Sequence, residues 1–403
     1  MMINNILANF YIPLHIIFTL QIVNQMGCLM SKKSQQLANN QQWTTTDKTY
    51  SWSNRDRSHL MNYLIENESN SIQIRLPGEI GGEQFIIQNC NDSTICLYDY
   101  SNTVTIDDCR NCTFFIGPVI GSIVIRNCQD CRLMSASQQF RTRDCKRLDL
   151  YIFCATQPAI ESCHNLVFSC FTANYKGLQE QFEKTNLQIY NNKWFNVYDF
   201  SIDNRDKHWT IDSSNNKLNE SFCSIPLDNN QLNLSFNPLT SLVPITEGLT
   251  SLDSISDDDE SFNMIIIYSH STLTLHNRIE SQVGKLVREI HFNFKELVLL
   301  MTRYLDSELS IKNILTRMLN GKEEEMMLNN DKGNKSRLTP NQSIIMLYRG
   351  KFNAERLNEI CRRIFCPQMH HGGHAEIKFK MIERNQNEFI FNECLTLTFD
   401  NCF

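Results

Sequence analysis

A cysteine recurs at a nearly constant interval through the middle of the chain, and this repeat constrains the fold more than any other feature. The repeat cysteines are separated by 19, 19, 17 and 18 residues, and they are Cys90, Cys109, Cys128, Cys145 and Cys163. Apolar residues recur at fixed offsets from them, three and five residues before and five residues after most of the cysteines. A period of this length with alternating apolar positions is typical of short strands stacked in a solenoid. Each coil alone leaves its inward face uncovered, and stacking builds one continuous core.

The repeat therefore predicts a parallel β-helix or β-solenoid over roughly residues 72–175. The columns expected to face inward include the residues five before the first four cysteines, Phe85, Val104, Ile123 and Phe140, and those five after all five of them, Ile95, Phe114, Leu133, Leu150 and Phe168. Side chains alternate between the two faces of a strand, so the residues between these positions are expected to face solvent.

The cysteines themselves have three interpretations: a metal site, disulfides, or buried thiols. Cys109 and Cys112, followed by Cys128 and Cys131, satisfy a generic zinc-ligand spacing. However, the position three after each repeat cysteine holds a leucine in two coils, Leu148 and Leu166. A column that accepts leucine is a core column, in which cysteine acts as a small apolar residue. Stacked coils also hold equivalent Cβ atoms farther apart than a disulfide allows. We favour buried thiols, which suit a cytosolic protein.

The charge balance limits the partners. The chain of 403 residues carries 38 basic and 44 acidic side chains, a formal net charge of −6. Binding to the phosphates of nucleic acid requires a basic face, so we do not expect a nucleic-acid partner.

The amino-terminal region carries a pattern for lipid attachment. Residues 1–25 are interpreted as a leader or a gene-model extension, because Met26 is followed by Gly27 and Cys28 and then by Ser31. A glycine after a methionine with a serine four residues on fits N-myristoylation, and Cys28 would accept a palmitoyl chain. Two acyl chains give the stable membrane attachment that one does not. We expect residues 26–71 to be an acylated, mostly disordered segment. The apolar stretch Ile6 to Val23 offers a marginal alternative, an uncleaved membrane anchor.

Arginines stand among the positions expected to face solvent. Arg141 lies between the inward-facing Phe140 and Thr142, so its guanidinium should be exposed on a rigid strand. Arg126, Arg143 and Glu161 occupy outward positions within about one coil of it. A row of solvated charges is the ordinary interpretation of such a face.

Several motifs resemble the tubulin-binding cofactor C domain family over residues 76–200. They are Gly82-Glu-Gln-Phe85, Asp108-Cys109-Arg-Asn-Cys112, Gly117-Pro118-Val-Ile-Gly121-Ser122, Gln138-Gln139-Phe140-Arg141-Thr-Arg143-Asp144-Cys145 and Ala155-Thr156-Gln157-Pro158-x-Ile160-Glu161-Ser162. The resemblance implies a right-handed parallel β-helix, in agreement with the columns, and places the bounds of the cofactor C domain at residues 72–200. It also implies a GTPase-activating protein, in which Arg141 supplies an arginine finger to the partner.

By this resemblance the GTPase interface would include residues around the finger, namely Gln138, Gln139, Arg143, Glu161 and Arg126. Arginine suits the role because its guanidinium is permanently charged and offers five donors in a fixed geometry. Phosphoryl transfer depends mainly on positioning and charge stabilisation, so one such group has a large effect. The dual-acylation pattern and the carboxy-terminal domain resemble family members that act on an Arf-like small GTPase in the trafficking of lipidated proteins to membranes and cilia.

The carboxy-terminal part is expected to hold a second domain. Residues 201–262 are rich in Asn, Ser and Asp and are interpreted as a linker. Residues 263–403 show strand and helix patterns, including strands at 264–268 and 344–348, and the family resemblance implies a small nucleoside-diphosphate-kinase-like α/β domain. Residues 321–342 are polar and charged and are expected to be a disordered insertion. The histidines of Met369-His370-His371-Gly372-Gly373-His374 could bind a metal, although a flexible polar loop is the simpler interpretation.

Three functions remain open from the sequence. The first is a GTPase activator, with no catalysis of its own and no cofactor or metal, on the cytoplasmic face of the plasma membrane, at the ciliary base and in the cytoplasm. The second is a non-catalytic effector or scaffold that binds the GTP form of the GTPase. The third is a tubulin-folding cofactor that acts on tubulin.

Overall fold

The structure is a computed structural model. It describes residues 61–201, 208–214, 218, 222, 225, 232–248, 261–269, 276–305, 342–351, 353–365 and 377–383. Every feature described below lies within residues 58–403. The lipidation residues Gly27 and Cys28, residues 321–341 of the predicted insertion, and the histidines at 370, 371 and 374 all lie outside the described residues. Gln342, predicted to end the insertion, instead begins a strand (Gln342–Arg349).

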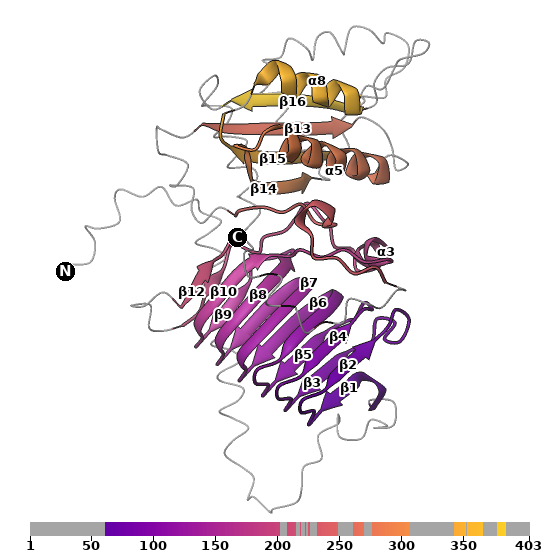
Figure 1. Ribbon diagram of the computed structural model, residues 1–403, viewed down its shortest axis with the longest axis vertical. Coiled ribbons are helices and arrows are strands. Elements are labelled where there is room, and N and C mark those ends of the chain that lie inside the picture. Colours follow the sequence, from indigo (N-terminus) through magenta and orange to yellow (C-terminus); the bar gives the residue numbers. More distant parts are fainter. Residues whose placement is uncertain are drawn as a thin grey trace, which may run out of the picture. The chain divides into compact units, whose positions relative to one another are not determined.

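The first domain is a parallel β-helix, as predicted. After a short 3₁₀ helix, η1 (Met61–Tyr63), its strands are β1 (Leu64–Glu66), β2 (Ile72–Arg75), β3 (Phe85–Gln88), β4 (Thr94–Leu97), β5 (Val104–Asp107), β6 (Thr113–Arg126), β7 (Gln129–Arg143), β8 (Lys146–Cys154), β9 (Ala159–Glu161), β10 (His164–Cys170), β11 (Tyr198–Asp199) and β12 (Trp209–Ile211). The pairings among these strands are parallel. Figure 1 shows the strands stacked side by side in the order of the coils.

The register confirms the columns predicted from the repeat. Val104 pairs with Phe85 on one side and with Ile123 on the other, and Ile123 pairs with Phe140. In the second column Phe114 pairs with Ile95 and Leu133. The side chains of both columns are buried and belong to one apolar cluster. The period of about 18 residues is therefore the length of one coil.

Two strands run across a corner of the solenoid, from one sheet face to the next. The first part of β6 pairs with β4, and its last part, after register shifts, pairs with β5. Gly117 lies at this corner, where a Cβ atom would stand 2.5 Å from the carbonyl oxygen of Asp99. A side chain would separate the coils, because backbone approaches this close require glycine. This contact explains the glycine of the Gly117-Pro118 motif.

The opposite corner is a turn built around each repeat cysteine. The residue before the cysteine has a positive φ in every coil, and so does the residue two after it; the pairs are Asn89 and Asp92, Asp108 and Asn111, Asn127 and Asp130, Asp144 and Arg147, and Ser162 and Asn165. Asn and Asp tolerate this left-handed backbone better than most side chains. The turn thus accounts for the polar residues that flank the cysteines.

The repeat cysteines lie in the core. Each of the five is buried, and each thiol donates to the carbonyl oxygen two residues before it, at 3.2 to 3.3 Å. Cys112 and Cys131 lie in the column that also holds Leu148, and they make the same kind of bond. The described cysteines of the β-helix are free thiols, and neighbouring coils are linked by hydrogen bonds such as that from the Cys109 amide to the Cys128 sulfur at 3.4 Å.

Two domain boundaries differ from those predicted. The β-helix begins before residue 72, because β1 (Leu64–Glu66) pairs in parallel with β3. The predicted linker at 201–262 also includes packed structure: β12 pairs with β10, and Phe222, Phe236 and Val243 are buried against the helix α3 (Leu178–Lys184) and its neighbours. Polar composition concealed these widely spaced apolar residues.

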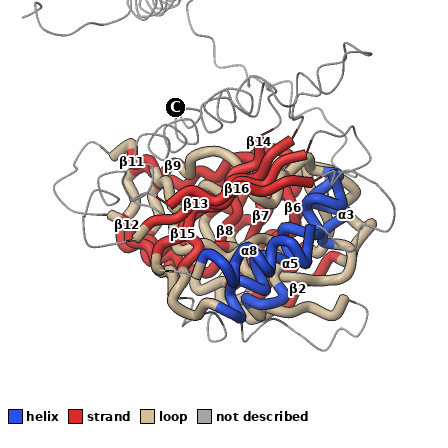
Figure 2. Tube along the Cα trace, turned by 90° about the horizontal axis from the view of Figure 1, so that it is seen from above, coloured by secondary structure: helices blue, strands red, loops and turns tan. Residues whose placement is uncertain are grey.

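The second domain is a small α/β unit, as predicted. It runs β13 (Phe262–Ser269), α5 (His276–Asn293), β14 (Val298–Leu305), β15 (Gln342–Arg349), α8 (Ala354–Phe365) and β16 (Ile377–Glu383). The sheet order is β14-β15-β13-β16 and the described pairs are antiparallel, which gives a split βαβ, ferredoxin-like arrangement. The helices α5 and α8 contact each other and lie side by side (Figure 2). They bury one face of the sheet through Val283, Leu286, Leu357 and Ile360.

The helices of the described segments are too short or too polar to cross a lipid bilayer.

Candidate functional site

Arg141 projects from the sheet face formed by the last parts of β6 and β7 together with β9. Its neighbours along the outward row are Val124 on β6 and Ala159 on β9. Phe140 and Thr142, on either side of it in sequence, are buried. The guanidinium is exposed, and Nη2 donates to the Gln139 side-chain oxygen at 3.3 Å. Ser122 donates to the same oxygen at 3.2 Å, so Gln139 is itself held in place.

The two arginines of the adjacent row have carboxylate partners. Arg126 makes two hydrogen bonds with Asp107, at 2.8 and 2.6 Å, and this contact raises the pKa of Arg126. Arg143 lies 3.2 Å from Asp144. Arg141 has no carboxylate partner among the residues that the structure describes. Its charge is therefore available to an incoming anion, whereas the charges beside it are already compensated.

The structure brings most of the predicted site residues onto this one face. Arg126, Arg143 and Glu161 stand opposite one another in register on β6, β7 and β9. Gln139 contacts the Arg141 guanidinium directly. Gln138 is half-buried, and its carbonyl oxygen accepts bonds from the Thr156 amide at 3.1 Å and hydroxyl at 2.9 Å. Their roles toward a partner stay predictions.

Two aromatic residues at the site were missed by the sequence reasoning. Tyr198 pairs with Ala159 and so extends the row of Arg141, and the Phe200 amide donates to the Ile160 carbonyl at 2.8 Å. Their side chains are 49% and 61% exposed, and their ring centroids lie 4.4 Å apart. Exposed aromatic pairs next to a rigid sheet often mark a surface for protein contact. The signal in the sequence was the alternation of Tyr198, Asp199 and Phe200, but β11 follows a long connection and lacks the repeat cysteine.

Asp199 fastens β11 to the rest of the domain. Its carboxylate lies 2.7 Å from Nδ1 of His208, which is buried, and accepts from the Ser201 amide at 2.8 Å. Partial burial alone would raise the pKa of Asp199, but the hydrogen bonds from Ser201 and His208 outweigh it and lower that pKa. The charged carboxylate thus holds the strand that carries both exposed aromatic residues.

Within the described segments, no group of three or more His, Cys, Asp or Glu side chains is arranged to hold a metal ion. The chemistry of this face rests on one unpaired guanidinium, its amide support and the adjacent aromatic pair.

Comparison with known proteins agrees with the fold. The profile of the tubulin binding cofactor C family matches residues 82–200, which contain Arg141 and both aromatic residues. The match defines the class of protein as one with a tubulin-binding cofactor C domain.

Individual relatives show to which group within this family the chain is most similar. Protein XRP2 from Gallus gallus is 34% identical over 271 residues, covering 64% of this chain and 75% of the relative. Protein XRP2 from Homo sapiens is 36% identical, covering 64% of this chain and 74% of the relative. Tubulin-specific chaperone C from Bos taurus is 30% identical over 33% of this chain and 39% of the relative. The chain belongs to the tubulin-binding cofactor C domain family and, within it, to the proteins related to XRP2.

Proposed function

We propose that this chain accelerates GTP hydrolysis by an Arf-like small GTPase and supplies Arg141 as an arginine finger in trans. The observation that carries the proposal is the contrast between Arg141, exposed and without a described carboxylate partner, and the paired Arg126 and Arg143 beside it. The Arf-like class of partner comes from the family resemblance of the Gln138–Arg143 motif. In this role the chain has no catalytic activity of its own and completes the active site of its partner.

The geometry suits stabilisation of a transferring phosphoryl group. Charge develops on the phosphoryl oxygens in the transition state, and a fixed cation there lowers the barrier. Arg141 stands on a strand with parallel partners on both sides, and Gln139 orients its guanidinium. Little conformational entropy is lost when such a side chain meets the phosphate. A finger supplied in trans is worth about 10³–10⁵ in rate.

The aromatic pair would provide affinity beside the finger. Strands are spaced by about 4.8 Å, so Tyr198, two strands from Arg141 along the same row, is held about 9.6 Å away along the sheet. Buried aromatic anchors contribute strongly to interfaces, while rim charges affect mainly the rate of encounter. We assign Tyr198 and Phe200 to binding and Arg141 to the chemical step.

Single-turnover GTP hydrolysis by a candidate Arf-like GTPase tests the proposal. We expect the full chain to accelerate the reaction, and Arg141→Ala to lose about 10³-fold or more while its Kd for the GTP-loaded partner changes little. Arg132→Ala is the matched control, because Arg132 is a half-exposed arginine on the same strand that belongs to the other sheet face. Tight binding with no acceleration by either protein would replace this proposal with the non-catalytic effector.

Tubulin is the second candidate partner. The likeness to tubulin-specific chaperone C, which is 30% identical over 33% of this chain, favours it. Tubulin also binds GTP, so the same Arg141→Ala comparison applies. Acceleration of GTP hydrolysis on tubulin, with none on any Arf-like GTPase, would assign the chain to tubulin folding.

We also propose that the chain acts on the cytoplasmic face of the plasma membrane and at the ciliary base, held there by a myristoyl group on Gly27 and a palmitoyl group on Cys28. The proposal rests on the sequence pattern alone. Mass spectrometry of the mature amino terminus tests it, and a peptide that spans Met26 and Gly27 would exclude acylation at Gly27.

A further inference from the structure

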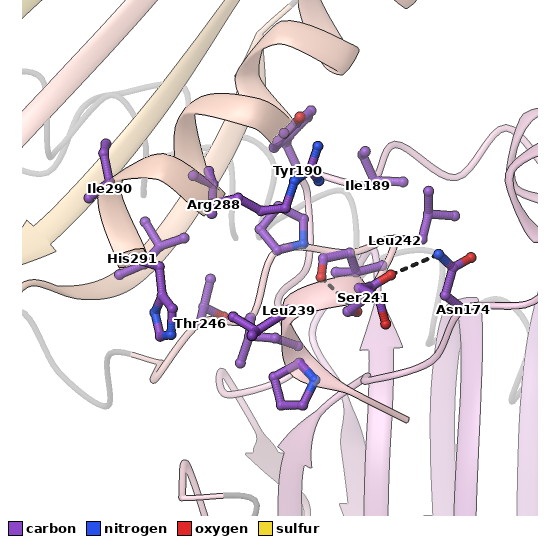
Figure 3. A pocket seen from close by; sticks show the side chains of 18 of the residues that line it. Asn174, Ile189, Tyr190, Leu239, Ser241, Leu242, Thr246, Arg288, Ile290 and His291 are labelled. Atoms are coloured by element: carbon purple, nitrogen blue, oxygen red, sulfur yellow. Dashed lines mark hydrogen bonds between the residues drawn. The ribbon is translucent and has the colours of Figure 1, made fainter. Parts of the chain in front are cut away.

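A cavity of about 530 Å³ lies within residues 58–403, away from the Arg141 face. One wall comes from residues 174–190 and 238–247, which follow the β-helix coils, and the other from α5 and the start of β14. Figure 3 shows Arg288, Ile290 and His291 on the α5 side, with Ile189 and Leu242 across from them. The volume falls within the range of small-molecule sites.

Most of the cavity wall is apolar. Phe182, Leu187 and Ile189 line one side, and Val287 and Ile290 line the other. Leu239 also lines the cavity, although its side chain is 53% exposed. A cavity of this kind favours an elongated apolar body, since such a body displaces water from carbon-lined walls.

One part of the lining is cationic. Arg288, His291 and Lys295 line the cavity, and none of them forms an ion pair with another described residue. Of the two carboxylates in the lining, Glu247 is already paired with Arg349. A basic residue in the last turn of a helix is ordinary, because it faces the negative end of the helix dipole. That explanation does not cover Lys295, which lies beyond the end of α5.

The Arg288 guanidinium lies next to Gly284 on α5. A Cβ atom placed on Gly284 would lie 3.6 Å from the Arg288 Nη1 atom and 3.9 Å from the Tyr190 hydroxyl. The Arg288 side chain therefore extends back along α5 toward the glycine, and both residues line the cavity. The missing side chain at Gly284 leaves space directly beside a guanidinium.

We propose that this cavity binds a single-chain amphiphile with a carboxylate headgroup, its chain against the apolar walls and its carboxylate at Arg288, His291 and Lys295. The inference is independent of the GTPase proposal, because it uses none of the residues of the Arg141 face. The carbon-lined walls favour such a ligand over a polar metabolite, and the cations without described partners favour it over a neutral lipid.

Binding of dodecanoate and tetradecanoate to the full chain, measured by isothermal titration calorimetry below their micelle concentrations, tests the proposal. We expect one saturable site, with affinity rising about fourfold for each added CH₂ group that is buried. Tetradecanol, with the same chain but no charge, should bind at least tenfold more weakly. Equal binding of the acid and the alcohol would overturn the carboxylate assignment, and the lack of any saturable site would overturn the whole proposal.

Two pairs of variants locate the ligand. Gly284→Leu should abolish binding by filling the cavity, whereas its control Gly284→Ala adds only a carbon at ordinary contact distance and should bind as the parent does. Arg288→Ala should weaken carboxylate binding about tenfold and leave the alcohol unaffected, while Lys285→Ala, on the same helix but outside the lining, should change neither. Unchanged carboxylate binding in Arg288→Ala would contradict the proposal even if Gly284→Leu failed to fold.

Discussion

Individual residues with a left-handed backbone set the turn in every coil. Asn127 precedes a repeat cysteine, has a φ of 51° and is exposed. Its backbone N–H donates to the Arg143 carbonyl oxygen at 3.2 Å. Since its side chain is outside the core, the backbone conformation is the main reason for an asparagine here. Left-handed backbone costs roughly 1–2 kcal/mol for most L residues and little for Gly.

We therefore expect Asn127→Ala to lower the free energy of unfolding by about 1 kcal/mol and Asn127→Gly to change it little. Urea unfolding of the two variants beside the parent checks this. Equal losses in the alanine and glycine variants would mean that the asparagine side chain, not its backbone, stabilises the turn.

Burial lowers the expected reactivity of two thiols, those of Cys154 and Cys170. It raises the pKa of Cys170 to about 11 and that of Cys154 to about 12. Because the thiolate is the reactive form, alkylation by iodoacetamide at pH 8 should be at least 100-fold slower at both cysteines in the folded protein than in urea. Peptide mass spectrometry after timed labelling measures each rate separately. Fast labelling of Cys170 in the folded state would show that the coil there opens.

At the same scale, the repeat cysteines could be assigned to the core from the sequence, because Leu148 and Leu166 share a column with Cys112 and Cys131. The turn geometry was not anticipated, although the Asn or Asp before the first four repeat cysteines was visible. Such residues occur in many solvated loops, so their meaning became specific only with the positive φ values.

Among the elements, β11 both closes the end of the β-helix and carries the aromatic pair, so the stability of this strand affects both. It pairs with β9 through only two residues, Tyr198 and Asp199. A strand this short depends on additional bonds, and the Asp199 carboxylate supplies them through Ser201 and His208. The same charge therefore bears on both folding and the presentation of Tyr198 and Phe200.

The pKa of Asp199 is lowered in the folded protein, so its contribution is present above the unfolded-state pKa, near 3.9, and is lost as the pH falls through the lower folded-state value. We expect Asp199→Asn to have a lower Tm than the parent at pH 7, with the difference shrinking below about pH 4. Thermal melts between pH 7 and pH 3 check this. A Tm difference that stays constant across the range would exclude the carboxylate charge as the cause.

The elements also show where composition misleads. The strands β13 and β15 followed from their apolar runs at 264–268 and 344–348, whereas β12 and the buried Phe222 and Phe236 lie in a stretch interpreted as a linker. Short strands and single buried aromatic residues produce no periodicity, because periodicity needs several turns or alternations to appear.

For the whole molecule, the proposed division of labour separates binding from catalysis. Phe200→Ala should weaken binding of the GTP-loaded partner by 10-fold or more and leave the rate at saturation within a few-fold of the parent. Arg141→Ala should do the reverse. The dependence of the single-turnover rate on the concentration of this chain distinguishes the two cases, and a loss of saturating rate in Phe200→Ala would place the aromatic pair in the chemical step.

The fold of the described domains was more predictable than the candidate site. Stacked coils produce a regular period in the sequence, so the β-helix and the exposure of Arg141 could be predicted from the columns of equivalent residues. The arginine finger came from the family motif, because an exposed arginine by itself is ordinary. The cavity beside α5 could not be predicted, because its lining combines residues 174–190 and 238–247 with residues 284–299. Contacts between segments so far apart in the sequence leave no local sequence pattern.

The stacked strands also determine how a partner must be shaped. Val124, Arg141, Ala159 and Tyr198 follow one another across the sheet at single-strand steps, each of about 4.8 Å. The spacing between the cation and the aromatic ring is thus set by backbone hydrogen bonds, which do not depend on the identity of the core side chains. Substitutions in the core can alter stability while the face keeps its dimensions. A partner that recognises this face must fit the distance between Arg141 and Tyr198, which can change only by a multiple of the strand spacing. The core residues can therefore diverge in sequence without changing that distance.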